Sequence, residues 1–288
     1  MDKFFVSVVL PAFNEEEAIE KVIEDVKASM DTSGYEYEIL VIDDNSSDKT
    51  ASLAEGKGVK VVRRLQTGGS GSSRKTGILA AKGEVIVMLD ADGTYEAADI
   101  PKLLEYFPEY DQVNGARTTE EGTLKILRLP AKWFILKIAC YLTGVNIPDL
   151  NTGLKAFKKD IMKKYLWVLP NGFSCVTTMT LAFISNGYPV KYIPTNYHKR
   201  IGKSKFHPIK DTLAYLKVIF RMVMYFNPMR VFMPLSFIIF LLGLFKSWSS
   251  YSSTGSLQES DIIIFMASLM IAVVGLLADL IVAYQNRA

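Results

Sequence analysis

Residues 6–17 read VSVVLPAFNEEE, an apolar run that ends at a proline and continues into acidic residues. Residues 6–10 are rich in β-branched side chains, which predicts a buried strand. Asn14 can cap a helix, and glutamates in a first turn favour one. The segment therefore predicts a strand followed by a helix that buries one face, formed by Ala18, Ile19, Val22, Ile23 and Val26.

The same order of strand and helix recurs downstream. Further strands are predicted at residues 38–42, 59–63 and 85–89, with helical segments between them. Such alternation predicts an α/β fold with a mostly parallel sheet, whose ligands bind where the strands end at their carboxyl side. The polar residues predicted at those ends are Asn14, Asp43, Asp44, Asp90 and Asp92.

Asp90-Ala91-Asp92 places two carboxylates directly after the strand at residues 85–89. Two hard oxygen ligands held together suit Mg²⁺ or Mn²⁺, which can bridge the phosphates of a nucleotide diphosphate. An isolated turn of this kind is usually only solvated, but its place at a strand end favours a metal and diphosphate site.

Asp43 and Asp44 also follow an apolar strand, and two interpretations stay open for them. A carboxylate there can accept a hydrogen bond from a ribose hydroxyl or a base N–H. Helix capping is the alternative, and the neighbouring Asn45, Ser46 or Ser47 could do it equally well. The glycine-rich residues 68–71 match neither a Walker loop nor the Gly-x-Gly-x-x-Gly motif, so a plain flexible loop is expected there.

Residues 199–210 form a basic loop in which Arg200, Lys203 and Lys205 surround a small flexible turn. Such a loop suits a phosphate. An amphipathic helix is predicted next, at residues 211–226, so the phosphate could be a lipid headgroup. A general basic patch facing anionic lipid is the alternative. His198 and His207 flank the loop without acidic partners, and do not indicate a metal.

Residues 231–248 and 262–284 are long apolar segments, and each can cross ~30 Å of hydrocarbon as a helix. The loop expected between them, residues 249–261, has no Lys or Arg, whereas the outer flanks are basic. The positive-inside rule therefore predicts a membrane hairpin with both termini in the cytoplasm. A buried hairpin of a soluble protein is the alternative. Asp279, inside the second segment, receives no role.

Composition sets further limits on function. The chain has 288 residues, of which 49% are hydrophobic, and a net charge of +3 that is too weak to indicate nucleic acid. Cys140 and Cys175 form no closely spaced pair and are expected to be ordinary core residues. The chain begins with a strand rather than a signal peptide, so we expect the N-terminal domain in the cytoplasm.

Five motifs in order resemble family 2 glycosyltransferases, and within them the branch of dolichyl-phosphate mannose synthases and polyprenyl-phosphate glycosyltransferases. They are VVLPAFNEE at residues 8–16, VIDDNS at 41–46, DADG at 90–93, NTGLKAF at 151–157, and the Arg200-x-Gly-x-Ser-Lys205 loop. The resemblance implies a GT-A (Rossmann-like) nucleotide-sugar-binding domain at residues 1–207. A juxtamembrane helix at 208–228 and a transmembrane hairpin at 229–288 would follow.

The resemblance also implies roles for individual residues. Asp92, Arg200 and Asp149 would serve catalysis, with Asp149 close to the sugar. Asp90 and Asp92 would hold the metal. The acceptor phosphate would meet Arg117, Arg200, Ser204 and Lys205. The nucleotide would meet Pro11, Ala12, Asn14, Glu15, Asp43, Asp44, Asp90 and Ala91. Two positions depart from the branch: Thr94 replaces a metal-contacting glutamine, and Lys155 replaces a frequent arginine.

The reaction expected from this resemblance is inverting transfer of a sugar from a nucleotide-sugar to a polyprenyl phosphate. A lipid phosphate is already an anion at neutral pH, so no general base is required. Transfer to a hydroxyl is the alternative, and it would need a carboxylate base, for which Asp149 is the candidate. A non-catalytic membrane scaffold is a further alternative, disfavoured by the presence of Asp90, Asp92 and Arg200.

Overall fold

The computed structural model describes residues 4–118, 133, 136–141, 143–172, 174–201, 217, 220, 221 and 224–285. The chain divides into two compact units, Met1–Ile219 and Phe220–Ala288, which are considered separately. Ser204 and Lys205 lie outside the described residues, as do Lys203 and His207 and most of the helix expected at residues 211–226.

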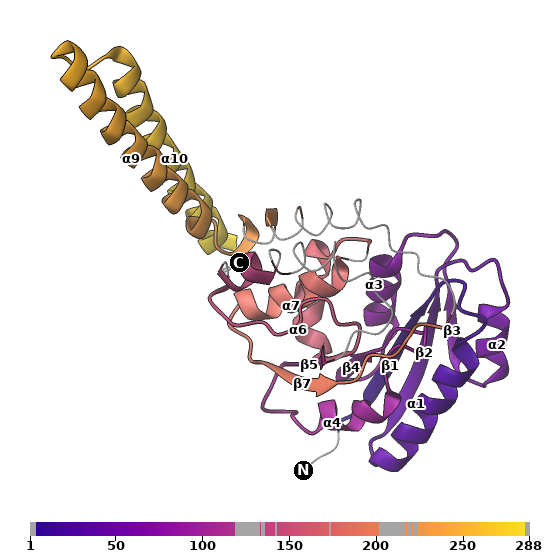
Figure 1. Cartoon of the computed structure of the whole chain (residues 1–288). Helices are drawn as coiled ribbons and strands as arrows, with labels where there is room; N and C mark the ends of the chain where they lie inside the picture. Colours follow the sequence, from indigo (N-terminus) through magenta and orange to yellow (C-terminus); the bar gives the residue numbers. More distant parts are fainter. Residues whose placement is uncertain are drawn as a thin grey trace. The chain divides into compact units, whose positions relative to one another are not determined.

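A seven-stranded sheet forms the centre of the first unit, in the order β3-β2-β1-β4-β6-β5-β7. Strands β1, β2, β3 and β4 are parallel, and β5 is parallel to β7, whereas β6 runs antiparallel to both β4 and β5. The predicted α/β fold is therefore confirmed, with one reversed strand (Figure 1). The strands are β1 Val6–Ala12, β2 Tyr37–Asp43, β3 Lys60–Arg63, β4 Val85–Met88, β5 Gln112–Arg117, β6 Lys155–Lys158 and β7 Val190–Thr195.

Helices cover both faces of this sheet. Alternate residues of β1 separate two packing layers: Val6, Val8 and Leu10 belong to the core under α1 and α4, and α3 packs on β1 and β2. The α-helices of this unit are α1 Ile19–Ser33, α2 Thr50–Gly56, α3 Ser70–Ala80, α4 Ile100–Leu104, α6 Lys159–Lys164 and α7 Cys175–Ser185, with 3₁₀ turns at Ala97–Asp99 and Leu166–Val168.

The predicted apolar face of α1 is buried, but the expectation that Asn14 caps this helix is wrong. α1 begins only at Ile19, and Asn14 adopts a positive φ of 50°. Its Oδ1 accepts a hydrogen bond from the backbone N–H of Ser47 at 2.8 Å, and its own N–H donates to Oγ of Ser46 at 2.9 Å. Asn14 therefore ties the end of β1 to the loop after β2.

The sheet topology gathers the ends of distant segments at one edge. Ala12 pairs with Asp43, and Val9 pairs with Met88, so β1, β2 and β4 end at the same edge. Because β6 is reversed, its first residue Lys155 lies beside Met88, and the segment before β6 enters at that edge. Arg117 ends β5 there and pairs with the last residue of β7. We call this edge of the sheet the carboxyl edge.

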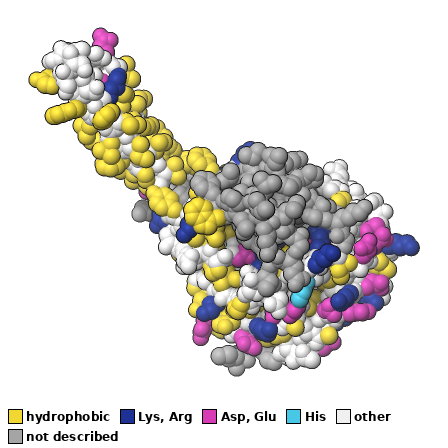
Figure 2. Space-filling view, in the orientation of Figure 1, with side chains coloured by type: hydrophobic (Ala, Val, Ile, Leu, Met, Phe, Trp, Pro, Cys, Tyr) yellow, Lys and Arg dark blue, Asp and Glu magenta, His cyan; other side chains and the backbone are white. Residues whose placement is uncertain are grey.

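The second unit is a helical hairpin of α9, Met229–Thr254, and α10, Glu259–Gln285. Both helices are long and apolar enough to cross a membrane. Their contact surface includes small residues: the hydroxyls of Ser236 and Ser268 each donate to the other's carbonyl oxygen, at 2.8 and 3.0 Å. Large apolar side chains cover the outer surface of the hairpin (Figure 2).

The connection between the two helices is shorter than the expected loop at residues 249–261. α9 continues to Thr254, and the hydroxyls of Ser252 and Ser253 donate to carbonyl oxygens one turn earlier, at 2.9 Å each. Asp261 lies inside the start of α10, where it accepts the N–H of Gln258 at 2.9 Å and caps the helix. Hydropathy alone marks the apolar core of each helix and misses these polar ends.

Candidate active site

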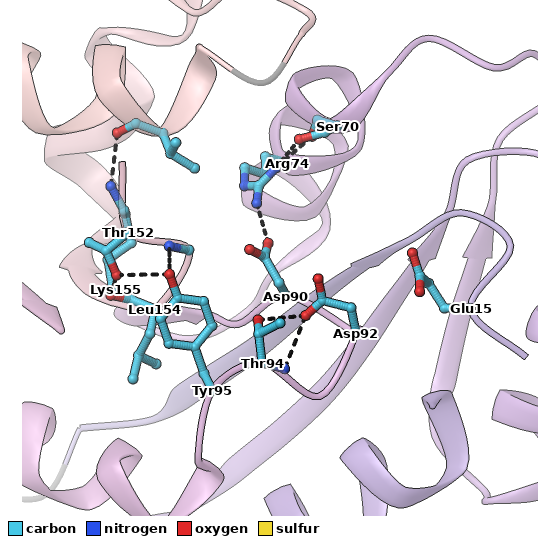
Figure 3. Close-up of polar contacts among 12 residues, drawn as sticks. Glu15, Ser70, Arg74, Asp90, Asp92, Thr94, Tyr95, Thr152, Leu154 and Lys155 are labelled. Atoms are coloured by element: carbon cyan, nitrogen blue, oxygen red, sulfur yellow. Dashed lines mark hydrogen bonds and ion pairs between the residues drawn. The ribbon is translucent and has the colours of Figure 1, made fainter. Parts of the chain in front are cut away.

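Asp92 is buried at the carboxyl edge after β4, and its two oxygens have different partners. Oδ1 accepts hydrogen bonds from the N–H and the Oγ1 of Thr94, at 3.1 and 2.6 Å, as Figure 3 shows. Oδ2 lies 3.1 Å from Nη1 of Arg200. Burial raises the pKa of Asp92, and the negative charge of Asp90 raises it further, against the hydrogen bonds of Thr94 and the charge of Arg200.

Asp90 is held from two sides. Arg74, which lies on α3, donates to Oδ1 of Asp90 and also bonds to Ser70 (Figure 3). On the opposite side the carboxylate rests against Gly153, where a Cβ atom would lie 2.0 Å from Oδ2 of Asp90. A glycine is therefore required at position 153 for Asp90 to adopt this position.

Arg200 connects the ends of β1 and β4. Its Nη2 donates to Oε1 of Glu15, and its Nη1 contacts Asp92. The predicted acceptor-side arginine thus lies between a carboxylate predicted to bind nucleotide and one predicted to bind metal. Its Nε is buried and has no hydrogen-bond partner among the described residues.

Asp90 and Asp92 suit a divalent cation that takes its other ligands from the substrate and from water. Burial and the charge of Asp90 raise the pKa of Asp92, and a cation between the two carboxylates would stabilise their charges. Among the described residues, no group of three acidic, histidine or cysteine side chains could hold a metal. The hydroxyl of Thr94 donates to Asp92 at 2.6 Å and so helps to hold that carboxylate in place. Phosphate oxygens and water would complete the coordination, as is usual for Mg²⁺.

The two acids after β2 differ in what they bind. Asp44 accepts the N–H groups of Gly68 and Gly69, at 3.1 and 2.8 Å, and pairs with Arg64. It therefore fixes the glycine-rich segment that was expected to be a flexible loop. Asp43 accepts only the N–H of Ser46 among the described residues, at 3.3 Å, through Oδ2. Its Oδ1 is buried without a partner and remains able to accept from a nucleoside.

Arg117 and Asp149 form a bidentate ion pair, as their shared position at the carboxyl edge allows. Nε and Nη2 of Arg117 donate to the two oxygens of Asp149 at 2.6 and 2.9 Å. The same oxygens accept the backbone N–H groups of Arg117 and Asn151, at 3.3 and 3.1 Å. The two side chains are 13% and 4% exposed, so this pair is largely removed from water.

Two tyrosines lie between this ion pair and the carboxylates of Asp90 and Asp92. The ring of Tyr197 faces Arg117 at 5.3 Å and meets the ring of Tyr95 edge-on at 5.2 Å. The hydroxyl of Tyr95 accepts the N–H of Gly153 at 2.7 Å (Figure 3). Burial and then the charge of Asp92 raise the pKa of Tyr197, which keeps this phenol neutral at physiological pH.

Lys155 is fully buried beneath this edge, although it is the first residue of β6. Its Nζ donates to the carbonyl oxygen of Val176 at 2.8 Å and to Oγ1 of Thr180 at 3.0 Å. Burial and then the nearby charge of Arg74 lower the pKa of Lys155 to about 7. Lys155 therefore ties the start of β6, beneath the site, to α7.

The remaining described residues of the predicted site are also at the carboxyl edge. Pro11 and Ala12 are the last residues of β1, and Ala91 is buried between Asp90 and Asp92. His198, judged to have no acidic neighbour, in fact lies 2.6 Å from Glu96 through Nε2. Cys175 is buried in the core, as expected for it, whereas Cys140 is partly exposed.

Sequence reasoning missed Arg64, Arg74 and the two tyrosines. Arg64 and Arg74 flank the glycine-rich segment, and a positive charge next to such a segment was a usable signal. Tyr95 and Tyr197 had no such signal. They meet because a bridge joins Tyr95 to Tyr197 across the edge, which depends on the fold of distant segments.

Comparison with known proteins agrees with this geometry. Residues 7–166 match glycosyl transferase family 2, and residues 227–284 match the GtrB C-terminal hairpin. A dolichyl-phosphate hexose transferase of Haloferax volcanii is 28% identical over 72% of this chain and 89% of that protein. An undecaprenyl-phosphate 4-deoxy-4-formamido-L-arabinose transferase of Edwardsiella ictaluri is 31% identical over 56% of this chain and 51% of that protein.

A solved structure shares the fold. Glucosyl-3-phosphoglycerate synthase of Mycobacterium tuberculosis, in complex with Mn²⁺, UDP and phosphoglyceric acid, has a TM-score of 0.62 at 19% identity, over 76% of this chain and 78% of that one. The family match spans more than half of the present chain and includes β1, β4 and the acids that follow them. This protein therefore belongs to glycosyltransferase family 2.

Proposed function

We propose that this protein transfers a sugar from a nucleotide-sugar to the phosphate of a polyprenyl lipid at the cytoplasmic face of a membrane. The bond between the anomeric carbon and the nucleotide diphosphate would break as a phosphate oxygen of the lipid forms a new bond from the opposite side. The products would be an inverted polyprenyl-phosphate sugar and a nucleoside diphosphate. The names of the relatives from Haloferax and Edwardsiella support this class of acceptor.

The hydrogen bonds that Asp149 accepts favour a phosphate over a hydroxyl as the acceptor. A hydroxyl acceptor needs a general base with an available lone pair. Both oxygens of Asp149 accept hydrogen bonds from Arg117, and one also accepts from Asn151. A carboxylate so engaged holds its charge and is a poor base. An acceptor that is already an anion, such as a phosphate, avoids this need.

The donor would bind along the ends of β1, β2 and β4. The unpartnered Oδ1 of Asp43 can accept a hydrogen bond from the nucleoside, beside Pro11, Ala12 and Asn14. Asp90 and Asp92 would hold Mg²⁺ or Mn²⁺, which neutralises the charge that develops on the leaving diphosphate. Arg200, with Ser204 and Lys205, would bind the acceptor phosphate, and Arg117 would hold Asp149 near the sugar.

The helices α9 and α10 would anchor the enzyme in the membrane. Their length and apolar surface suit a spanning hairpin, and the connection at residues 255–258 has no Lys or Arg. Labelling of a Ser256→Cys variant in intact cells tests the orientation. Reaction with an impermeant maleimide before permeabilisation is expected, and reaction only afterwards would reverse the proposed topology.

A panel of radiolabelled UDP- and GDP-sugars, each with a polyprenyl phosphate, tests the reaction. We expect one donor to give a chloroform-extractable product that mild acid hydrolyses, as a glycosyl phosphate does. A product that resists mild acid would indicate a hydroxyl acceptor instead. Transfer with no lipid present would reject the proposed acceptor altogether.

A further inference from the structure

Arg200 neutralises two carboxylates that belong to different strands. Its two terminal nitrogens reach Glu15 after β1 and Asp92 after β4. The side chains of Glu15 and Asp92 are 9% and 10% exposed, whereas that of Arg200 is 24% exposed. Buried carboxylates require a counter-charge, and here one partly accessible guanidinium provides it for both.

The backbone sets the position of Arg200. Ile201 donates its N–H to the carbonyl oxygen of Asp92 at 3.1 Å, and His198 donates to that of Thr94 at 2.9 Å. The side chain of Ile201 lies against Gly93. The segment at residues 197–201 is therefore held along the turn that carries Asp92, so Arg200 lies close to that carboxylate.

A cation at Asp92 would need the oxygen that Arg200 contacts. Oδ1 is engaged by Thr94 through two hydrogen bonds, which leaves Oδ2 as the available ligand. Mg²⁺ binds a carboxylate oxygen at about 2.0–2.1 Å. A guanidinium nitrogen lies 3.1 Å from the same oxygen, so its positive charge would be within a few ångströms of the ion and would repel it. The two cations therefore compete for Oδ2.

We infer that Arg200 and the divalent cation exchange at Oδ2 of Asp92, so that binding of the metal-bound donor releases Arg200 to bind the acceptor phosphate. This inference rests on the proposed function. It makes Arg200 a residue shared by two sites, which couples them. The donor would bind first, and the acceptor would in turn strengthen binding of the donor, because such coupling is reciprocal.

Arg74 provides a matched control. It is the partner of Asp90, as Arg200 is of Asp92, but it belongs to α3 and its side chain is only 5% exposed. It contacts Oδ1 of Asp90, and Asp90 keeps its other oxygen. Arg74 is therefore expected to stay in place when a cation binds.

Modification by phenylglyoxal, read by mass spectrometry on the full chain in lipid nanodiscs, tests the exchange. Asp92→Asn without metal should raise the modification rate of Arg200 several-fold, because its counter-charge is weakened. Wild type with Mn²⁺, and with Mn²⁺ plus UDP or GDP, should show the same rise. Arg74 should stay protected, and the exposed Arg63 should react at a constant rate. An unchanged rate at Arg200 in either experiment would overturn the inference.

A second measurement tests whether a variant binds the metal more tightly, which a simple loss of function would not produce. Calorimetric titration with Mn²⁺ should show roughly tenfold tighter binding to Arg200→Ala than to wild type, since the competitor is gone. Equal or weaker binding contradicts the exchange. If Mn²⁺ releases Arg200 but no nucleotide-sugar yields a lipid product, the proposed function fails and the exchange stands. If lipid product forms while Arg200 reacts equally with and without Mn²⁺, the reverse holds.

Discussion

Two of the arginine–aspartate pairs at the carboxyl edge, Arg117 with Asp149 and Arg200 with Asp92, use the same chemistry in opposite ways. Arg117 and Asp149 meet through two parallel hydrogen bonds, and backbone N–H groups engage both oxygens further. Arg200 instead divides its two terminal nitrogens between Asp92 and Glu15. Both oxygens of the first carboxylate are engaged by the same guanidinium, whereas Arg200 gives Asp92 and Glu15 one terminal nitrogen each.

The difference shows that burial alone does not separate a structural ion pair from a functional one. Asp92 and Asp149 are about equally buried, since the whole residues are 7% and 4% exposed. What differs is the number of donors on each oxygen and the accessibility of the arginine. A fully satisfied pair fixes geometry, and a divided one can exchange partners when another cation arrives.

Breaking the pair of Arg117 and Asp149 should have the largest effect, and it should be on stability. Arg117→Met leaves Asp149 buried without its partner, which typically costs about 3–5 kcal/mol. Thermal unfolding of the purified protein in detergent should show the loss. In contrast, Arg200→Met should cost less, because its side chain is more exposed and its segment is held by backbone hydrogen bonds.

A double variant sharpens this test. Replacing both members, as Arg117→Met with Asp149→Leu, should recover much of the stability, since a buried pair and a matched apolar pair are often equivalent. Activity should remain low, because the site would lose the charges near the sugar. Recovery of both stability and activity would show that this pair has no part in the reaction.

Asp92→Asn should have the largest effect on turnover. Loss of one charge-stabilising group typically lowers kcat by ~10²–10³. Thermal unfolding should change little, because Asn retains the oxygen that accepts from Thr94. Chelation of divalent cations by EDTA should lower wild-type activity to a similar level. Full activity in EDTA would reject the metal site.

The part of the carboxyl edge that β1, β2 and β4 form could be predicted from sequence, because the strand pattern alone places its polar residues. The strands β1, β2 and β4 each end at or just before the polar residues concerned, so Asp43, Asp90 and Asp92 were placed correctly by the strand pattern. Parallel strands must end together, and no long-range contact was needed for that inference.

The rest of this edge could not be predicted because distant segments create it. β6 contains only Lys155–Lys158, and its neighbours β4 and β5 pair with it in the antiparallel sense. That reversal brings Asp149 beside Arg117 and Lys155 beneath Arg74. Strand patterning has no signal for such pairing, and the motif resemblance named the residues without their partners.

Arg200→Ala should show an intermediate effect that separates the two steps it is proposed to serve. Loss of a charge-assisted bond to phosphate costs ~1.5–3 kcal/mol, so the apparent KM for polyprenyl phosphate should rise, kcat should fall, or both. Initial rates over a range of lipid concentrations measure this. A normal KM for lipid, together with lost nucleotide binding, would assign Arg200 to the donor alone.

The smallest predicted effect concerns the buried amine of Lys155. Unlike Arg117 and Arg200, it has no carboxylate in contact among the described residues. Its pKa is about 7 in the folded protein, against an ordinary value of about 10.4. Between these values the unfolded chain binds more protons, so stability should rise with pH. Below pH 7 both states are protonated, and this contribution becomes constant.

Lys155→Met isolates that contribution from other titrating groups. From pH 7 to pH 8, the free energy of unfolding of wild type should rise relative to the variant by about 1 kcal/mol. The variant should also be at least as stable as wild type at pH 7, because a buried ammonium opposes folding. Denaturant unfolding of both proteins at several pH values measures the difference. Parallel pH profiles would show that Lys155 keeps its proton in the folded state, stabilised by the charges of Asp90 and Asp149 above it.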